Sequence, residues 1–195
     1  MQLVVLGLNH KTVSVDIREQ FAISEESARS GLRHLDEQEG IEEAVVLSTC
    51  NRTEIYAVLK NGAARKTLYQ FFLALSGNSE AKKEYFFYFE GEACIRHLFE
   101  VASGLDSMVI GESQILNQIK TAYTMALSEK ATKTILNTLF HRAITTGKRV
   151  RTETRISYSA VSVSYAAVKL AEKILGGLDD RTAMVFGAGE AAELL

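Results

Sequence analysis

The segment that decides the fold spans residues 44–59 and reads AVVLSTCNRTEIYAVL. Its two apolar ends, residues 44–47 and 55–59, are rich in Val, Ile and Leu, which is typical of β-strands. The middle is polar and carries Cys50. We therefore expect two neighbouring strands whose connection holds the thiol, because loops at strand ends commonly present reactive groups on a rigid frame.

Further elements follow from the spacing of apolar residues. Residues 2–8 are apolar and residues 85–89 are aromatic, which predicts two more strands. Apolar residues at helical spacing predict helices at 16–23, 24–38, 62–75, 92–102, 114–128, 132–151 and 159–175. Residues 161–165 also alternate as a strand would, so the last assignment stays open. The aromatic run is interpreted as core and not as a platform for nucleic-acid bases, since no basic residue is interleaved with it.

Composition limits the kinds of protein that this chain can be. With 195 residues, 47% of them hydrophobic, it suits one sizeable domain or one domain plus part of another. The 22 basic and 24 acidic side chains leave a net charge of −2, which gives no bulk attraction to nucleic acid or anionic lipid. Two cysteines cannot form a disulfide framework, no secretory leader opens the chain, and no apolar run approaches the roughly 20 residues that cross a bilayer. We expect a cytoplasmic protein without membrane contact.

Cys50 is the first candidate for chemistry. A thiol reacts as thiolate, and a neighbouring cation such as Arg52 favours that form and is able to hold a substrate carboxylate through its paired donors. The alternative is a buried filler, because free cysteines are among the most buried residues. Cys94 and His97 lie three apart on one predicted helix, but two ligands are too few for a closed metal site, so no metal is expected.

Two further polar groups have open interpretations. Gln114 and Gln118 are four apart on a predicted helix and would present two amides to one ligand, although a solvated helix face has the same pattern. A basic stretch is able to meet a phosphate backbone, although charge runs on helices are mostly solvated. Its members are Lys148, Arg149, Arg151 and Arg155.

The last residues have the pattern of a nucleotide-binding turn. An apolar strand at 183–186 leads into glycines and helix formers, as at the start of a dinucleotide-binding unit. The candidate cofactor residues are Gly187, Ala188, Gly189, Glu190, Ala191 and Ala192. The predicted fold class is thus α/β: an α+β domain with a small sheet packed by helices, followed by helices and the first strand, turn and helix of an incomplete Rossmann-like domain. We expect domains at 1–155 and 156–195.

The order of the motifs along the whole chain resembles that of the glutamyl-tRNA reductase family. The motifs are GLNHKT at 7–12, STCNRTE at 48–54, VASGLDS at 101–107, IGESQIL at 110–116, KRVRTET at 148–154 and GAGE at 187–190. The resemblance implies that residues 1–155 form the catalytic domain that recognises the glutamyl group and that residues 156–195 begin the NADPH-binding domain. It also implies that Cys50 attacks glutamyl-tRNA to give a thioester, which NADPH reduces to glutamate-1-semialdehyde at the start of tetrapyrrole (porphyrin) synthesis.

The resemblance also implies roles for residues around the thiol. His97 matches a histidine that matters for activity, as a proton donor or an orienting group. The residues implied to surround the glutamyl group are Thr49, Asn51, Arg52, Ser107, Glu112, Ser113, Gln114 and Gln118. The family usually has proline at the position of Ser113, so this chain departs from the pattern there.

Partners and rival interpretations complete the expectations. The resemblance implies a homodimer formed through a later domain and hand-over of the product to a semialdehyde aminomutase. We expect residues 1–195 alone to acylate Cys50 and hydrolyse the ester without reducing it. The rivals are another cysteine-dependent acyl reductase and a non-catalytic RNA- or protein-binding module.

Overall fold

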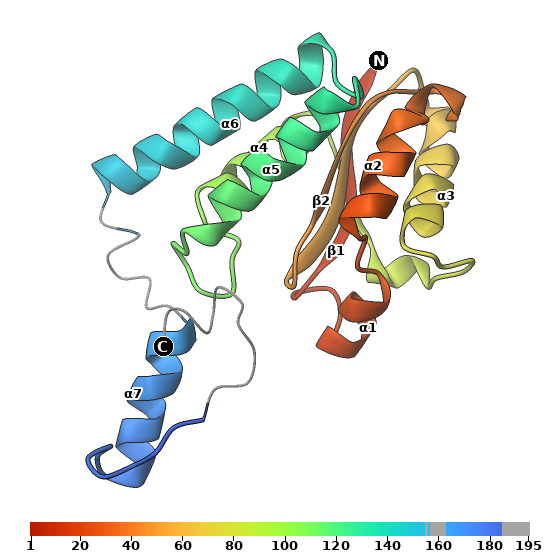
Figure 1. Cartoon of the computed structure of the whole chain (residues 1–195). Coiled ribbons are helices and arrows are strands. Elements are labelled where there is room, and N and C mark those ends of the chain that lie inside the picture. The colour runs from red at the N-terminus through yellow and green to blue at the C-terminus, as the bar shows by residue number, and fades with distance from the viewer. Residues whose placement is uncertain (155, 157–162, 185–195) are drawn as a thin grey trace.

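Four antiparallel strands form the centre of the fold. The computed structural model describes residues 1–154, 156 and 163–184. The strands β1 (Gln2–Asn9), β2 (Ile41–Ser48), β3 (Arg52–Leu59) and β4 (Phe87–Glu90) lie in the order β2-β3-β1-β4. The four strands predicted before residue 155 are confirmed. Every residue of β3 is buried, because β3 lies inside the sheet and helices cover both of its faces (Figure 1).

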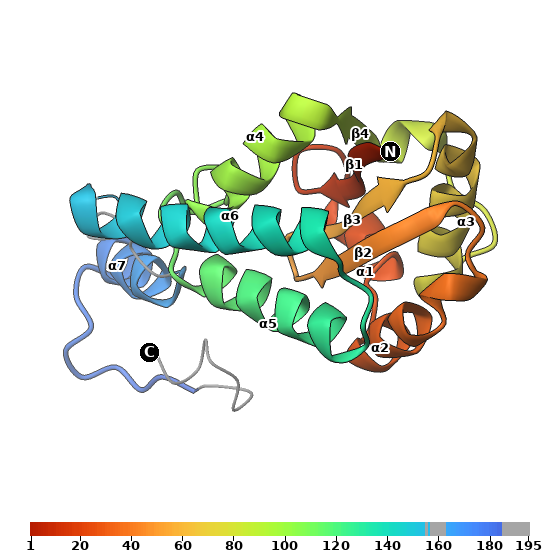
Figure 2. The ribbon, with the colours of Figure 1, turned by 90° about the horizontal axis from the view of Figure 1, so that it is seen from above.

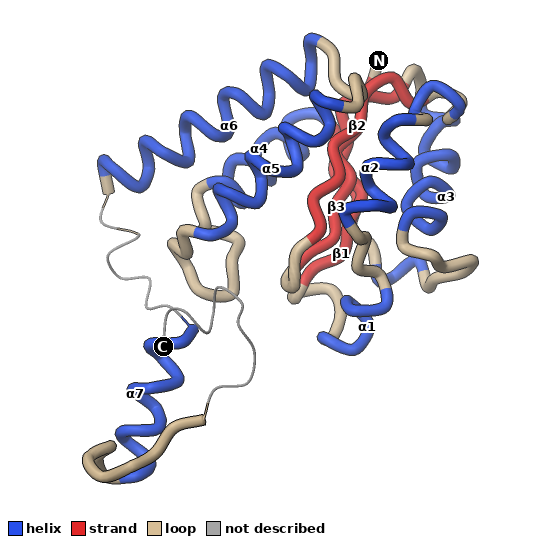
Figure 3. Tube along the Cα trace, in the orientation of Figure 1, coloured by secondary structure: helices blue, strands red, loops and turns tan. Residues whose placement is uncertain are grey.

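Two helical layers cover the sheet (Figures 1 and 2). One layer holds α4 (Gly91–Ala102), α5 (Gln114–Ser128) and α6 (Thr134–Glu153), and the other holds α2 (Glu25–Arg33) and α3 (Arg65–Leu75). The short helix α1 (Val15–Gln20) lies at the end of the sheet near the β2–β3 turn (Figure 3). The fold class of the main domain is confirmed as a small sheet packed by helices.

The helix ends differ from the predictions by a few residues. The helix expected at 24–38 begins after Ser24, whose side chain accepts the N–H of Ser27 at 3.1 Å. It ends at Arg33 and is followed by a 3₁₀ turn at Leu35–Glu37, and further 3₁₀ turns occupy Gly62–Ala64 and Lys83–Tyr85. Polar caps and tight turns decide such ends, and apolar spacing does not report them.

A buried carboxylate joins β2 to the start of α6. Glu43, which is 3% exposed, lies at a bulge in β2. It accepts the backbone N–H groups of Lys133, Ile135 and Leu136 at 2.7, 3.1 and 2.9 Å. These are the donors that a helix start leaves without partners. A distant side chain therefore caps α6 and fixes it to the sheet.

The last part of the chain is described only in part. The sequence left open whether residues 161–165 form a strand or a helix. The described residues among them belong to helix α7 (Val163–Leu175). Ala183 and Met184 are described without a strand, and the rest of the predicted strand and the residues 187–192 lie outside the described residues. The division near residue 155 therefore stays a prediction.

Candidate functional site

A tight turn at the end of the β2–β3 hairpin presents Cys50 to solvent. The hydroxyl oxygen of Thr49 accepts the N–H groups of Asn51 and Arg52, each at 3.2 Å, and the N–H of Thr49 donates to the carbonyl of Arg52 at 2.8 Å. Such side-chain bonds make a turn without glycine or proline. The thiol is exposed, so Cys50 is not a core filler.

The connection between β1 and α1 holds the same turn from one side. The N–H of His10 donates to the carbonyl of Asn51 at 3.0 Å, and Nε of Arg18 donates to the carbonyl of Cys50 at 3.3 Å. Nδ1 of His10 is buried and has no hydrogen-bond partner among the described residues. Burial and the charge of Arg52 lower the pKa of His10, which favours the neutral imidazole.

Arg52 lies beneath the turn and is only 2% exposed. Its Nη1 donates to Glu54 at 2.9 Å and to the carboxylate of Asp106 at 3.0 Å, and its Nη2 donates to the carbonyl of Asp106 at 2.6 Å. Burial opposes the charge, but the two carboxylates raise the pKa of Arg52. Two residues of its own chain, Glu54 and Asp106, therefore bind this guanidinium, and its contact with the glutamyl carboxylate stays a prediction.

Glu54 is the centre of this buried polar cluster. Besides Arg52, its carboxylate accepts the hydroxyl of Tyr56 at 2.7 Å and Nε2 of His97 at 3.0 Å. Arg52, Glu54 and Tyr56 are alternate residues of β3, so their side chains share the face toward α4 and α6. Burial opposes the charge of Glu54, but the hydrogen bond and charge of His97, with the charge of Arg52, hold its pKa below the usual value.

His97 contacts this cluster and an aromatic wall. It is 7% exposed, and its ring lies 5.0 Å from Phe87 and 5.3 Å from Phe89, measured between ring centroids. A cavity of about 360 Å³ is lined by His97 together with Lys11 and Asp106. The ring contacts Glu54 and the rings of Tyr56, Phe87 and Phe89, so any effect of His97 on Cys50 passes through Glu54 or a bound substrate.

Cys94 is the second thiol and has the opposite environment. It is fully buried, and burial together with the charge of Glu54 raises the pKa of Cys94 to about 12. In the described part of the chain, no group of three or more His, Cys, Asp and Glu side chains is arranged to hold a metal ion.

The connection between α4 and α5 approaches the Cys50 turn through Asp106, which Ser107 follows in the chain. Asp106 accepts from Arg52 and from Lys11, and these bonds lower its pKa although burial opposes its charge. The hydroxyl of Ser107 is buried and lacks a hydrogen-bond partner among the described residues. A buried hydroxyl without a partner costs about 1–3 kcal/mol. Ser107 therefore has a hydrogen bond to offer a ligand.

Arg151 holds both ends of that connection. Its Nη1 donates to the carbonyl of Ala102 at 2.7 Å, and its Nη2 donates to the carbonyl of Glu112 at 3.0 Å. In the predicted basic stretch, Arg149 forms an ion pair with Glu153 at 2.9 Å. Two of the four basic residues are thus engaged within the chain. Lys148 is exposed, and Arg155 lies outside the described residues.

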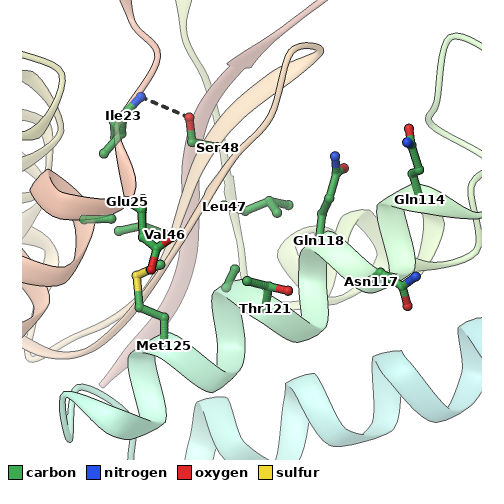
Figure 4. A pocket seen from close by; sticks show the side chains of 12 residues that line it. Ile23, Glu25, Val46, Leu47, Ser48, Gln114, Asn117, Gln118, Thr121 and Met125 are labelled. Carbon is green, nitrogen blue, oxygen red and sulfur yellow. Dashed lines mark hydrogen bonds between the residues drawn. The ribbon is translucent and has the colours of Figure 1, made fainter. Parts of the chain in front are cut away.

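A polar cavity of about 280 Å³ lies between the edge of β2, the start of α2 and the face of α5. Gln114 and Gln118 project from α5 to the same side, beside Leu47 and Ser48 of β2 (Figure 4). Ser48, two residues before Cys50, accepts the N–H of Ile23 at 3.0 Å. Gln114 is exposed and Gln118 is half-buried, and both amides line a cavity next to the hairpin turn. Their contact with a ligand stays a prediction.

Asn117 and Thr121 line this cavity too, and the sequence predictions missed them. With Gln114 and Gln118, they form a polar stripe spaced by three and four residues, a signal that was present in the sequence. Glu112 is half-buried and Ser113 is exposed, directly before the first residue of α5. Neither lines the cavity.

None of the helices within the described ranges has the length and apolar character that crossing a bilayer requires. The predicted cofactor residues Gly187–Ala192 lie outside the described residues, so the NADPH prediction is not tested by this structure.

Comparison with known proteins agrees with the resemblance of the motifs. Residues 6–154 match the model of the family described as glutamyl-tRNA(Glu) reductase, N-terminal domain. The chain is 52% identical to a glutamyl-tRNA reductase of Geobacter metallireducens and 49% identical to one of Trichlorobacter lovleyi, with 100% of this chain and 45% of each relative aligned.

A solved structure agrees with the fold. The glutamyl-tRNA reductase of Methanopyrus kandleri superposes with a TM-score of 0.69 at 39% identity, over 96% of this chain and 44% of that one. The chain spans about half the length of the relatives it matches.

Proposed function

The chain belongs to the family of the glutamyl-tRNA reductase N-terminal domain, and from this premise we propose that it receives the glutamyl group of glutamyl-tRNA on Cys50. The thiolate sulfur forms a bond to the ester carbonyl carbon, and the bond from that carbon to the ribose oxygen breaks. The tRNA leaves with a proton on its ribose oxygen, and a glutamyl thioester stays on the protein.

The observation that carries this proposal is the exposed thiol at the apex of a turn held on both sides. Bonds from Thr49, His10 and Arg18 fix the backbone around Cys50. A nucleophile held in this way loses little entropy when an ester approaches it. Cys94, in contrast, is sealed in the core.

We propose that recognition of the glutamyl group uses donors on two sides of the turn. The amides of Gln114 and Gln118 are on the β2 side, and the unpartnered hydroxyl of Ser107 is on the Asp106 side. Thr49, Asn51, Arg52, Glu112 and Ser113 stay predicted contacts. For Arg52, the bonds to Glu54 and Asp106 support a positioning role, in which its charge holds the cluster beneath the turn.

Within the whole protein, the proposed reaction is reduction of the thioester to glutamate-1-semialdehyde for tetrapyrrole synthesis. NADPH would supply the hydride when bound. The role of this chain is then to bind the ester, exclude competing acyl groups and hold the thioester. The homodimer, the hand-over to an aminomutase and the cytoplasmic location stay predictions.

The test is mass spectrometry of the intact protein quenched after mixing with glutamyl-tRNA. A glutamyl adduct on Cys50, lost in Cys50→Ser, is expected, together with released glutamate and no semialdehyde when NADPH is added. Semialdehyde formation by residues 1–195 would contradict the prediction for this chain.

Acylation rates with different aminoacyl-tRNAs distinguish the proposed function from its two alternatives, another cysteine-dependent acyl reductase and a non-catalytic binding module. Aspartyl-tRNA and glutaminyl-tRNA should acylate Cys50 far more slowly than glutamyl-tRNA does. Their side chains would leave polar groups of the binding site without hydrogen-bond partners, which costs binding free energy. Equal acylation by all three donors would favour another acyl reductase. Binding without any adduct would favour a non-catalytic module.

A further inference from the structure

A third cavity, of about 470 Å³, lies between α3 and the β4 edge of the sheet and takes no part in the proposed acyl transfer. It is lined by three basic and three aromatic side chains: Arg65, Lys66, Lys83, Tyr69, Phe86 and Tyr88. The turn that carries Cys50 connects β2 to β3 at one end of β3, whereas Gly62 of this cavity follows the other end of β3.

The charges around this cavity are unbalanced. No acidic residue lines it, and none of the ion pairs among the described residues includes Arg65, Lys66 or Lys83. Lys60, in contrast, contacts Glu42 at 3.1 Å. The first turn of α3 also lacks an acidic residue. Three unpaired cations around one hollow favour an anion there.

The aromatic side chains make a rigid floor. Phe86 packs edge-on against Phe72 and Tyr69, with ring centroids 5.1 and 5.4 Å apart. The hydroxyl of Tyr69 donates to the carbonyl of Ala81 at 2.9 Å. The guanidinium carbon of Arg65 lies 3.9 Å from the ring centroid of Tyr88. Guanidinium planes and aromatic rings are the surfaces on which proteins stack single-stranded bases.

The fold brings basic side chains from other segments to the aromatic run, where the local sequence has none interleaved. The aromatic run at 85–89 was assigned to the core because no basic residue is interleaved with it. In the structure, Arg65 and Lys66 approach it from the start of α3, and Lys83 comes from the turn before β4.

We propose that this cavity binds one nucleotide of an RNA strand, with the phosphate between Lys66 and Lys83 and the base against Arg65 and Tyr88. The inference rests on the proposed function, in which the RNA is the tRNA that carries the glutamyl group. Binding here adds affinity for the tRNA and leaves the chemistry at Cys50 unchanged.

The test compares two double variants with equal loss of charge. Lys66→Gln with Lys83→Gln removes the proposed phosphate contacts, and Lys130→Gln with Lys173→Gln removes two exposed lysines elsewhere. Binding of fluorescent uncharged tRNA is measured by anisotropy across a salt series. The first variant should bind about tenfold more weakly, with the salt slope reduced by about 0.7–0.9 because one phosphate contact is lost, and the second should match the unaltered chain.

Two further binding measurements complete the test. Arg65→Gln should also weaken binding of a single-stranded oligonucleotide, because a stacking plane is lost. Equal weakening by both double variants, or none by the first, overturns the proposal. Binding of free AMP with no lysine-dependent binding of tRNA also overturns it, in favour of a free nucleotide as the ligand.

A small glutamyl thioester without RNA separates this proposal from the proposed function. The Lys66 and Lys83 variant should be acylated by it at the normal rate. If Cys50 accepts no glutamyl group from either donor while tRNA binding still depends on the two lysines, the proposed function fails and the RNA site stands.

Discussion

Arg52 and Glu54 form an ion pair of 2.9 Å that is shielded from solvent directly beneath the turn that presents Cys50. Their side chains share one face of β3, and Asp106 completes the charge balance from the α4–α5 connection. The most exposed reactive group of the domain thus rests on one of its most buried polar clusters.

Breaking this pair should destabilise the fold. Glu54→Gln keeps the shape but leaves Arg52 short of one counter-charge, and removal of one partner of a buried pair costs about 3–5 kcal/mol. Urea unfolding measures the free energy of unfolding. Glu90→Gln, at an exposed position of β4, is the matched control and should change it by less than about 0.5 kcal/mol. Equal, small effects of the two variants would show that the pair is not structural.

The same cluster predicts an acid limit to stability. The pKa values of Glu54 and Asp106 are both held below their usual values, so the unfolded chain binds protons at a higher pH than the folded chain. Their contribution is therefore complete above about pH 5, begins to fall near the unfolded pKa values of about 4, and is lost as the pH falls through the lower folded pKa values. The urea midpoint measured from pH 6 to pH 3 should fall, less steeply in Glu54→Gln. Parallel curves for the two proteins would contradict this assignment.

Glu43 and its neighbour Glu42 give a matched pair of variants. Glu43→Ala leaves three N–H groups of α6 without a partner, and we expect a loss of about 2–3 kcal/mol. Glu42→Ala removes only ion pairs to the exposed Lys60 and Lys133, which should cost less than about 1 kcal/mol. Thermal or urea unfolding measures both losses, and a reversed order would refute the capping role.

The two thiols should differ sharply in alkylation. Cys50 is exposed, whereas Cys94 is buried with a pKa raised to about 12. Iodoacetamide at pH 8 should therefore add once to the folded protein and twice to the unfolded protein, as measured by intact mass. Folded Cys50→Ser should remain unmodified over the same time. Rapid modification of Cys94 in that variant would show that the core opens more readily than its packing implies.

Gln118 tests the polar cavity. Gln118→Met keeps the size but removes the amide, and acylation of Cys50 by glutamyl-tRNA should slow about tenfold or more because a hydrogen bond to the glutamyl group is lost. The control is Gln70→Met, the same change at an exposed position of α3. Both variants should unfold at similar urea concentrations. A normal acylation rate in Gln118→Met would exclude that amide from recognition.

Much of the fold could be predicted from local pattern. The apolar runs on both sides of Cys50 predicted the hairpin, and the spacing of Leu68, Phe71 and Phe72 predicted α3. The strand order β2-β3-β1-β4 could not be predicted, because it depends on which faces pack together and not on any single segment.

The candidate site, like the fold, was predicted from the sequence only in part. The sequence by itself determined that a thiol stands between two strands, that two amides share one helix face, and which family the motifs resemble. Only the tertiary structure decided that Arg52 is bound by Glu54 and Asp106, and that Arg65 and Lys66 meet the aromatic run of β4. The physical reason is range: strand and helix periods are local, whereas burial and charge pairing join residues far apart in the chain, so they exist only once the sheet and its helices have packed.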